Sequence, residues 1–284
     1  MSKPRLAVTQ GDPRGIGPEI VAAALADARV RAACDCLVLE TGSAARADAA
    51  VAGQRAGAAI ERAVEMAQRG EVHGIATAPI DKHALFAGGY QDPGHTELLA
   101  RLTGARVAMM LASDRLRVVL ATTHIALRDV PARLTREVII DTARIARAGL
   151  REWYRIAEPR IALAALNPHA GEHGRFGSED DTVLAPAARE AGLSGPHPAD
   201  TVFVRALRGE FDAVIAPYHD VGMTAIKVAS FGSAVNVTLG LPWPRTSPDH
   251  GTAMDIAGTG RADPSSMIHA ILECARIAAL RTSP

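Results

Sequence analysis

Short apolar runs alternate along the chain with segments of helical period. Strands are predicted where apolar and β-branched residues stand together, and helices where apolar residues recur every three or four positions. This alternation is typical of a mostly parallel α/β fold. The predicted strands are Arg5–Gln10, Cys36–Glu40, His73–Ala78, Ala105–Ala112, Arg117–Thr123, Arg160–Leu166, Asp212–Ala216 and Ala234–Leu239. The predicted helices are one from Pro18, then Ala58–Arg69, Leu134–Trp153 and Ser266–Leu280.

One stretch of the chain carries little pattern. Glu40–Gly57 is rich in alanine and glycine and has no clear period, which predicts a loop or a short helix. No internal repeat, low-complexity run or obvious linker divides the sequence. Composition alone therefore marks no domain boundary.

Composition and charge narrow the class of protein. The chain has 284 residues, of which 48% are hydrophobic, enough for one large or two medium cores. A formal net charge of zero does not favour a nucleic acid or an anionic membrane as partner. The N-terminus enters the first predicted strand without an apolar signal region, and no apolar run approaches the roughly 20 residues that span a bilayer. We therefore expect a soluble, cytoplasmic protein.

Two rare residue types bear on the chemistry. The cysteines, Cys34, Cys36 and Cys274, have no metal-binding spacing and fit a reducing compartment as core residues. Lysine occurs only at Lys3, Lys82 and Lys227, in a chain whose other cations are arginines. A lysine in such a chain suggests a role for a compact ammonium group. We expect Lys3 to be a terminal solvated residue, whereas Lys82 and Lys227 both follow apolar runs read as strands.

Three histidines occupy equivalent places in the predicted fold. Each ends an apolar strand segment: VVLATTH at His124, IALAALNPH at His169 and AVIAPYH at His219. Ligands of open α/β sheets bind outside the carboxyl ends of the strands. One such histidine is more often structural, but three predict a shared divalent metal with positions left open for water or substrate. Three imidazoles suit zinc, and cobalt, manganese or magnesium are alternatives.

A glycine-containing segment near the C-terminus carries a second signal. His250–Pro264, HGTAMDIAGTGRADP, resembles the adenosine-binding loop of the isocitrate and isopropylmalate dehydrogenase superfamily, which binds NAD or NADP without a Rossmann fingerprint. The resemblance implies cofactor binding by His250, Gly251, Thr252 and Asp255. The early turn GDPRGIGPE lacks the ending of a Walker loop, and we expect the cofactor at the later loop instead.

Further motifs extend the resemblance over nearly the whole chain. Together they resemble the 4-hydroxythreonine-4-phosphate dehydrogenase (PdxA) family of pyridoxine (vitamin B6) biosynthesis and its paralogues. The motifs are GDPRGIGPE (11–19), TAPIDK (77–82), GHTELLA (94–100), TTHIALRDV (122–130), LNPHAGE (166–172), GPHPADTVF (195–203), YHDVG (218–222) and FGSAVNVTLGLPWPRTSPDHGTA (231–253).

The resemblance implies a fold and an assembly. The fold class is α/β, with two α/β/α domains and a cleft between them, as in isocitrate and isopropylmalate dehydrogenases. We place the first, discontinuous domain at residues 1–125 plus about 240–284, and the second at about 126–239. The family also implies a homodimer whose metal ligands come from both subunits.

The resemblance assigns roles to individual residues. It places metal ligation on the three histidines already chosen. It places substrate binding on His95, Thr96, Lys227, Asn236 and Arg245, with Lys227 and Arg245 pairing with a carboxylate or phosphate. Thr96 has a rival reading as a helix N-cap.

More than one residue is a candidate for proton transfer. Lys227 and Asp220 are the candidates for the general base, and Asp200 and Asp220 are candidates for orienting a histidine or helping to move the proton. The implied reaction is oxidation of a metal-bound hydroxyl by NAD, with loss of carbon dioxide from the resulting β-keto acid. Lys82 faces the same site or is a solvated surface residue.

Two departures from the family pattern leave the substrate open. Val221 stands where the family usually has Gln, and the chain is a few dozen residues shorter, which we place around Glu40–Gly57. The first hypothesis is oxidation of 4-phosphohydroxy-L-threonine or a related 4-phosphorylated acid. The alternatives are a cis-dihydrodiol carboxylate dehydrogenase and a shortened paralogue that binds metal and ligand without turnover. NADP remains an alternative to NAD.

Overall fold

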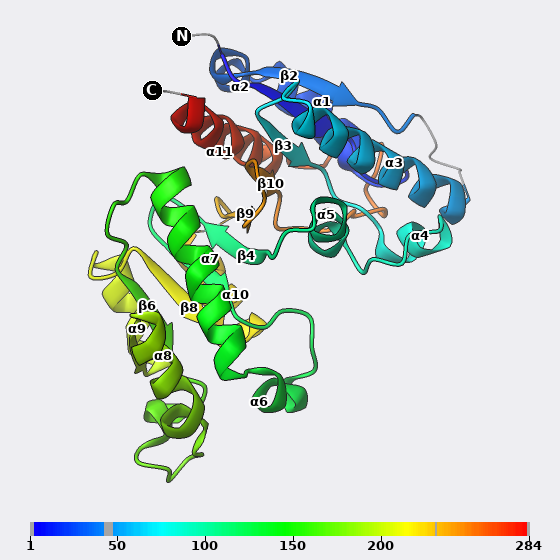
Figure 1. The fold of residues 1–284 in the computed structure, drawn as a ribbon. Coiled ribbons are helices and arrows are strands. Elements are labelled where there is room, and N and C mark those ends of the chain that lie inside the picture. The colour runs from blue at the N-terminus through cyan, green and yellow to red at the C-terminus, as the bar shows by residue number, and fades with distance from the viewer. Residues whose placement is uncertain (1–2, 43–47, 231, 283–284) are drawn as a thin grey trace. The chain divides into compact units, whose positions relative to one another are not determined.

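The chain folds into two compact units. In a computed structural model, which describes residues 3–42, 48–230 and 232–282, residues 1–106 with 235–284 form unit 1 and residues 107–234 form unit 2 (Figure 1). The units divide at 106/107 and 234/235, where the sequence suggested 125/126 and about 239/240. That these units correspond to folding domains stays a prediction. Among the described residues, no helix combines the length and apolar character needed to cross a membrane.

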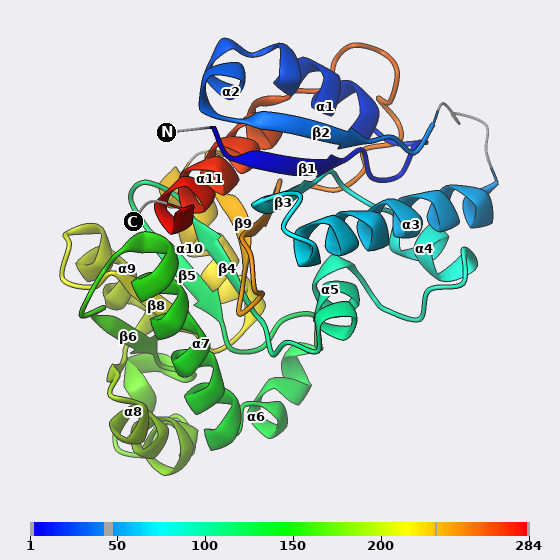
Figure 2. The ribbon, with the colours of Figure 1, turned by 45° about the horizontal axis from the view of Figure 1, so that its top comes forward.

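Unit 1 is built on a mostly parallel sheet. Its strands run in the order β2-β1-β3-β10-β9, all parallel except β9, which is antiparallel to β10. Alternate residues of β1 and β3, such as Leu6 and Ala76, pack with α1 and α11 in one core, as the period of two requires. The elements are β1 (Arg5–Thr9), α1 (Gly17–Ala26), α2 (Ala28–Ala33), β2 (Asp35–Leu39), α3 (Ala49–Gln68), β3 (Gly74–Thr77), α4 (Lys82–Ala87), α5 (His95–Thr103), β9 (Val235–Leu239), β10 (Arg245–Ser247) and α11 (Ser265–Thr282) (Figure 2).

Unit 2 is also built on a mostly parallel sheet. Its strands run in the order β4-β5-β8-β6-β7, parallel except for β4, which is antiparallel to β5. Val118, Ala164 and Val214 share a core with Val202 of α9 and Ile226 of α10. The elements are β4 (Ala108–Ala112), β5 (Arg117–Leu120), α6 (Val130–Arg133), α7 (Arg136–Tyr154), β6 (Ile161–Ala164), α8 (Ala185–Ala191), β7 (Ser194–His197), α9 (Ala199–Leu207), β8 (Ala213–Ala216) and α10 (His219–Ser230).

The eight predicted strands are confirmed to within a few residues at their ends, and two further strands are present. β7 and β10 were not predicted, because Ser194–His197 contains Gly and Pro and Arg245–Ser247 is short and polar. The four predicted helices are also confirmed. The segment that begins at His219 was not recognised as a helix, so the expectation that Lys227 directly follows a strand is wrong; Lys227 lies in the last turn of α10.

The expectation of a loop or short helix at Glu40–Gly57 is corrected in part. Residues 43–47 lie outside the described residues, but α3 begins at Ala49, nine positions before the predicted start. The Asp48 side chain caps it by accepting a hydrogen bond from the Ala50 N–H at 3.2 Å. Glycine lowers helix propensity, yet Gly53 is required here because a Cβ at that position would lie 1.7 Å from the Ala84 oxygen of α4.

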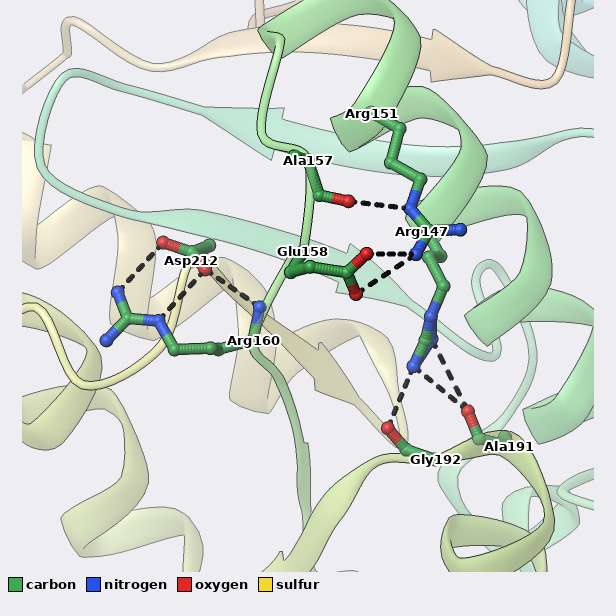
Figure 3. A network of polar contacts seen from close by, with 8 residues as sticks. All are labelled: Arg147, Arg151, Ala157, Glu158, Arg160, Ala191, Gly192 and Asp212. Atoms are coloured by element: carbon green, nitrogen blue, oxygen red, sulfur yellow. Dashed lines mark hydrogen bonds and ion pairs between the residues drawn. The ribbon is translucent and has the colours of Figure 1, made fainter.

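Polar contacts from Arg147, Arg151 and Arg160 connect the loops of unit 2 (Figure 3). Arg147 of α7 donates to the terminal carbonyl of α8, Ala191, and to the following Gly192. Arg160 and Asp212 stand immediately before the paired strands β6 and β8. The Asp212 carboxylate accepts from the Arg160 backbone N–H at 2.8 Å and from its guanidinium at 3.0 and 3.2 Å. This contact fixes where the two strands begin.

Asp212→Asn is expected to lower the stability of the protein modestly. Burial opposes ionisation of Asp212, but the hydrogen bonds from Arg160 outweigh it and lower the pKa of the carboxyl. The Arg160 side chain is exposed, so we expect a loss of about 1 kcal/mol, or a few degrees in Tm, at neutral pH. The stabilisation is present above the unfolded pKa near 4 and disappears as the pH falls through the lower folded pKa.

Thermal melts between pH 7 and pH 3 measure this effect. The matched control is Asp114→Asn, in the exposed turn between β4 and β5. An Asp212 variant that melts with the wild type at pH 7, or that differs from it equally at both ends of the range, contradicts the argument.

Candidate active site

Two of the three predicted metal-binding histidines come together in unit 2. The rings of His124 and His219 have centroids 5.6 Å apart and are tilted by 46°. His124 follows β5 in the chain, and His219 follows the neighbouring parallel strand β8, so both side chains emerge at the same edge of the sheet. They line a small cavity of about 120 Å³, together with Thr123, Ile125, Leu127, Val130, Tyr218 and Asp220.

A carboxylate orients one of these histidines. The Nδ1 atom of His219 lies 2.7 Å from Oδ1 of Asp220. A donor at Nδ1 leaves Nε2 with its lone pair available, which is the arrangement that metal-binding histidines adopt with a neighbouring carboxylate. Asp220 therefore contacts His219 directly, and the predicted orienting role of Asp200 or Asp220 stays a prediction.

The third histidine lies in a loop of unusual backbone. His169 belongs to a 3₁₀ turn, Pro168–Gly171, after β6, and its side chain is exposed. Its backbone is left-handed, with a φ of 54°. Within the described residues no group of three or more His, Cys, Asp or Glu side chains is placed to hold a metal. A single chain therefore presents the His124–His219 pair, but not the complete predicted set of three ligands.

The other predicted residues of unit 2 lie on helices. Asp200 is exposed in the first turn of α9, a helix that contacts the turn carrying His169. Lys227 is exposed on α10, eight residues after His219. Eight residues of helix place the two Cα atoms about 12 Å apart along the axis. Within one chain their backbones are therefore well separated, and the predicted role of Lys227 stays a prediction.

Unit 1 contains a buried arginine whose hydrogen bonds, among the described residues, go to two hydroxyl groups. Arg245 of β10 has a relative exposure of 1%. It donates to the Thr238 hydroxyl at 3.0 Å and to the Thr77 hydroxyl at 2.6 Å, whereas its Nε has no hydrogen-bond partner. Burial lowers the pKa of Arg245 to about 10, so the group remains a cation at neutral pH. Among the described residues, the hydrogen-bond partners of this buried cation are neutral hydroxyls and Glu97 acts on it only through its charge, an arrangement that favours an anionic ligand.

Two further predicted substrate residues belong to the same surroundings. His95 begins α5, and burial followed by the charge of Arg245 lowers its pKa well below the usual value, so its imidazole is neutral. Asn236 pairs with Ser247 in the β9–β10 ladder, two residues from Arg245. The His95 Nε2 and Asn236 Oδ1 atoms are both buried, and neither has a hydrogen-bond partner in the part of the chain that the structure describes. Buried polar atoms of this kind are usually satisfied, and a polar ligand would satisfy them here.

For Thr96, the structure excludes one of the two roles that the sequence left open. Helix α5 begins at His95 after Gly94, which makes no side-chain cap. Thr96 therefore lies inside the first turn and is not the N-cap that one reading proposed. Its part in substrate binding stays a prediction. Lys82 is an exposed residue at the start of α4, and its role stays a prediction.

The early turn and the late loop pack against each other. The Ile16 N–H donates to the Thr252 carbonyl at 2.9 Å, and the Gly258 N–H donates to the Glu19 carboxylate at 3.1 Å. A cavity of about 440 Å³ lies beside this contact, within the range of small-ligand pockets. Its lining comes from the turn after β1, the end of β2 and the late loop: Gln10, Pro13, Arg14, Gly15, Pro18, Glu19, Glu40, Gly42, Met254, Ala257 and Gly258. The turn and the loop thus do not form separate sites.

The four predicted cofactor residues border this region and are not part of the cavity lining. Gly251 and Asp255 are exposed, and the His250 Nδ1 atom contacts the Gly251 oxygen at 3.0 Å. His250 Nε2 is buried and has no hydrogen-bond partner. The loop contributes Met254, Ala257 and Gly258 to the cavity instead.

Sequence reasoning missed several polar residues that shape these sites. Thr77 and Thr238 hold Arg245 from two different strands, and Asp180 is a fully buried carboxylate in the His169 loop. Arg14 is bound by Asp12 in a two-point contact at 3.0 and 2.7 Å. Thr77 lies within the TAPIDK motif and Arg14 within the GDPRGIGPE turn, so the motifs held part of the signal. Thr238 lies in the same 231–253 motif as Arg245, seven residues before it. Asp180 gave no signal, because its backbone partners Leu166 and Asn167 stand more than ten residues earlier and outside any short motif with it.

Comparison with known proteins identifies the relatives. The family model described as pyridoxal phosphate biosynthetic protein PdxA matches residues 18–274. The 4-hydroxythreonine-4-phosphate dehydrogenase of Geobacter metallireducens is 44% identical, with 99% of this chain and 98% of the relative covered. That alignment extends over 332 residues, so the relative carries residues that this 284-residue chain lacks. The chain is therefore shorter than this relative, as predicted, and the place of the missing residues around Glu40–Gly57 stays a prediction.

Solved structures agree. A 4-hydroxythreonine-4-phosphate dehydrogenase from Klebsiella pneumoniae is 38% identical with a TM-score of 0.87, covering 97% of this chain and 99% of that one. A terephthalate 1,2-cis-dihydrodiol dehydrogenase from Burkholderia xenovorans is 31% identical with a TM-score of 0.63, covering 93% and 94%. A β-decarboxylating dehydrogenase from Thermococcus kodakarensis, 17% identical with a TM-score of 0.54 over 94% of this chain and 81% of that one, shows the shared fold alone. The expected isocitrate/isopropylmalate dehydrogenase-like fold class is confirmed, and the chain belongs to the PdxA family.

Proposed function

We propose that this protein is a metal-dependent, NAD-linked dehydrogenase of a small 4-phosphorylated hydroxy acid, 4-phosphohydroxy-L-threonine or a close analogue, with decarboxylation of the product. Relatives named 4-hydroxythreonine-4-phosphate dehydrogenase support the activity. The observation that carries the proposal is the buried cation Arg245, whose charge acts on His95 and whose strand pairs with that of Asn236, since both neighbours have buried polar atoms without a partner among the described residues. An anionic group of the substrate would complete this cluster.

The metal proposal rests on the histidine pair. His124 and His219 are close enough to share an ion, and Asp220 leaves His219 with a free Nε2. The incomplete ligand set within one chain is what a site shared between two subunits of a homodimer would leave, and we include that assembly, in the cytoplasm, in the proposal. A divalent ion bound there would lower the pKa of the substrate hydroxyl.

The chain's own residues would handle binding and the proton. The Asp220 carboxylate holds the proton on His219 Nδ1, which suits it better to orienting that ring than to acting as base. Lys227 stays the stronger candidate for the base or for an anion contact, and Asp200 for a supporting carboxylate near the His169 turn. The neutral His95 imidazole would donate or accept a hydrogen bond beside the anion held by Arg245.

For the cofactor, the charged residues that line the cavity of about 440 Å³ beside the late loop favour NAD over NADP. Glu19 and Glu40 contribute two carboxylates to its lining. Among the described lining residues the cation is Arg14, whose guanidinium is occupied by Asp12 at 2.7 Å and Asp81 at 3.5 Å. A 2′-phosphate would meet carboxylates without an available cation. NAD would accept the hydride when bound.

An NADH-formation assay tests the proposed function. Chelator-treated protein is supplied with NAD, one divalent metal at a time and either a 4-phosphorylated hydroxy acid or a cis-dihydrodiol carboxylate. The proposal expects NADH from the phosphorylated acid only after metal is added. Turnover of the dihydrodiol alone would favour the second candidate, which the 31% identical dihydrodiol dehydrogenase supports. Absence of turnover with every combination would favour a ligand-binding paralogue.

Gly251→Trp is expected to weaken NAD binding without unfolding the protein. No heavy atom lies within 4 Å of a Cβ built at Gly251, so the larger side chain has room in the free protein. It would occupy space beside the loop that resembles an adenosine-binding segment. We expect at least about a tenfold rise in the NAD dissociation constant, or about 1.4 kcal/mol, by calorimetric titration. Gly251→Ala is the control and should bind normally; an unchanged affinity in the Trp variant would place NAD elsewhere.

A further inference from the structure

The loop that carries His169 has a costly backbone conformation. His169, Ala170, Glu172 and His173 all have positive φ values, of 54°, 56°, 42° and 56°. Each non-glycine residue in this region costs roughly 1 kcal/mol or more relative to ordinary conformations. Such a run persists only where contacts elsewhere hold it. We call residues 166–180 the histidine loop.

One buried carboxylate holds the start of this loop. Asp180 has a relative exposure of 0%. Its Oδ1 accepts the Leu166 N–H at 2.8 Å, and its Oδ2 accepts the Asn167 N–H at 2.9 Å. Both oxygens are thus used on consecutive backbone donors directly before the turn with His169. Hydrogen bonds to a carboxylate are stronger than those between neutral groups.

A second contact closes the loop in the same place. The Asn167 side-chain amide donates to Glu179 Oε2 at 2.9 Å. Adjacent residues at the end of the loop, Glu179 and Asp180, therefore clamp its beginning. A single π-helical turn, Asp180–Leu184, follows at once, a geometry often found near functional sites.

We propose that Asp180 is a positioning residue for His169. It fixes Leu166 and Asn167, and thereby the left-handed turn that sets the direction of the imidazole two residues later. The inference rests on the proposed role of His169 as a metal ligand. It adds a residue that touches neither metal nor substrate and acts through the backbone.

Asp180→Asn isolates this role with little change of volume. An amide has one oxygen and one NH₂ group, so one of the two backbone N–H groups would face a donor instead of an acceptor. The neighbour Asp181 is exposed, and Asp181→Asn is the matched control for loss of charge. Leu184→Ala, a fully buried position in the same turn, is the control for destabilisation alone.

The first measurement is the affinity for Co²⁺, by calorimetry on the metal-free full chain. Changes in groups that support a metal ligand weaken binding about 10- to 100-fold, and we expect this range for Asp180→Asn. His169→Ala should weaken Co²⁺ binding at least as much as Asp180→Asn does. Asp181→Asn should bind as the wild type, and Leu184→Ala should melt earlier while it keeps its affinity. Equal weakening in Leu184→Ala would overturn the positioning role.

The second measurement needs no metal. Arg175 lies exposed in the histidine loop, and trypsin cleavage after it reports how firmly the loop is held. Asp180→Asn should be cut faster there than Leu184→Ala at equal fractions of their melting temperatures. If the wild type binds no Co²⁺, the metal proposal fails while faster cleavage still supports the role of Asp180. Normal cleavage of Asp180→Asn would overturn that role, whatever the metal result.

Discussion

Arg245→Met is expected to lower kcat/KM by about 10²- to 10³-fold. Removing one member of a buried, hydrogen-bonded charge pair costs about 2–5 kcal/mol of binding, and each 1.4 kcal/mol is a factor of ten. The other member here would be the substrate anion. Folding should survive, because an apolar side chain of similar volume can replace a buried charge without loss of stability. Steady-state kinetics with the phosphorylated substrate measure the first effect, and a thermal melt the second.

Ligand protection separates binding from turnover in this variant. Inorganic phosphate or a phosphate ester should raise the Tm of the wild type but not that of Arg245→Met. The control is Arg62→Met, on the exposed face of α3, which should behave as the wild type in both assays. Equal protection of Arg245→Met would mean that the anion binds elsewhere in the chain.

The position of Arg245 shows where sequence reasoning reached its limit. Strands such as Ala213–Ala216 were predictable because they are continuously apolar, as strands buried on both faces must be. β10 is a three-residue strand, Arg-Thr-Ser, that lies between β3 and β9 and is wholly buried. No hydropathy pattern predicts a buried arginine. The family resemblance supplied the residue, and the two threonines that hold it became visible only from the pairing of the strands.

The positions of the three histidines could likewise be predicted from the sequence, whereas their contacts and backbone conformation could not. Their places after β5, β6 and β8 follow from the apolar runs and from the rule that ligands bind at carboxyl ends. The contact between His124 and His219 follows because β5 and β8 are neighbours, which chain order alone does not reveal. The left-handed His169 follows two residues whose N–H groups donate to Asp180, which stands eleven residues after His169. A bond between distant residues of this kind leaves no periodic trace in the sequence.

Lys227→Arg is expected to be far more damaging than its retained charge suggests. Lys227 is one of three lysines in a chain that otherwise uses arginine. A guanidinium does not deprotonate in the working range of pH, and its planar fork is bulkier than an ammonium group. Loss of a general base costs typically about 10²- to 10⁴-fold, and we expect turnover to fall by about 10²-fold or more. Stability should hardly change, because the side chain is exposed on α10.

The division of the loss between kcat and KM tells which role Lys227 has. The helical rise places Lys227 about 12 Å from His219 along α10, so an anion contact away from the metal-binding end predicts that KM rises most. A base predicts that kcat falls most and that KM changes little. Lys3→Arg, at the surface where Lys3 Nζ contacts the Arg31 carbonyl at 2.6 Å, is the control and should be unaffected. Near-normal kcat and KM in Lys227→Arg would return this residue to an ordinary solvated cation on a helix.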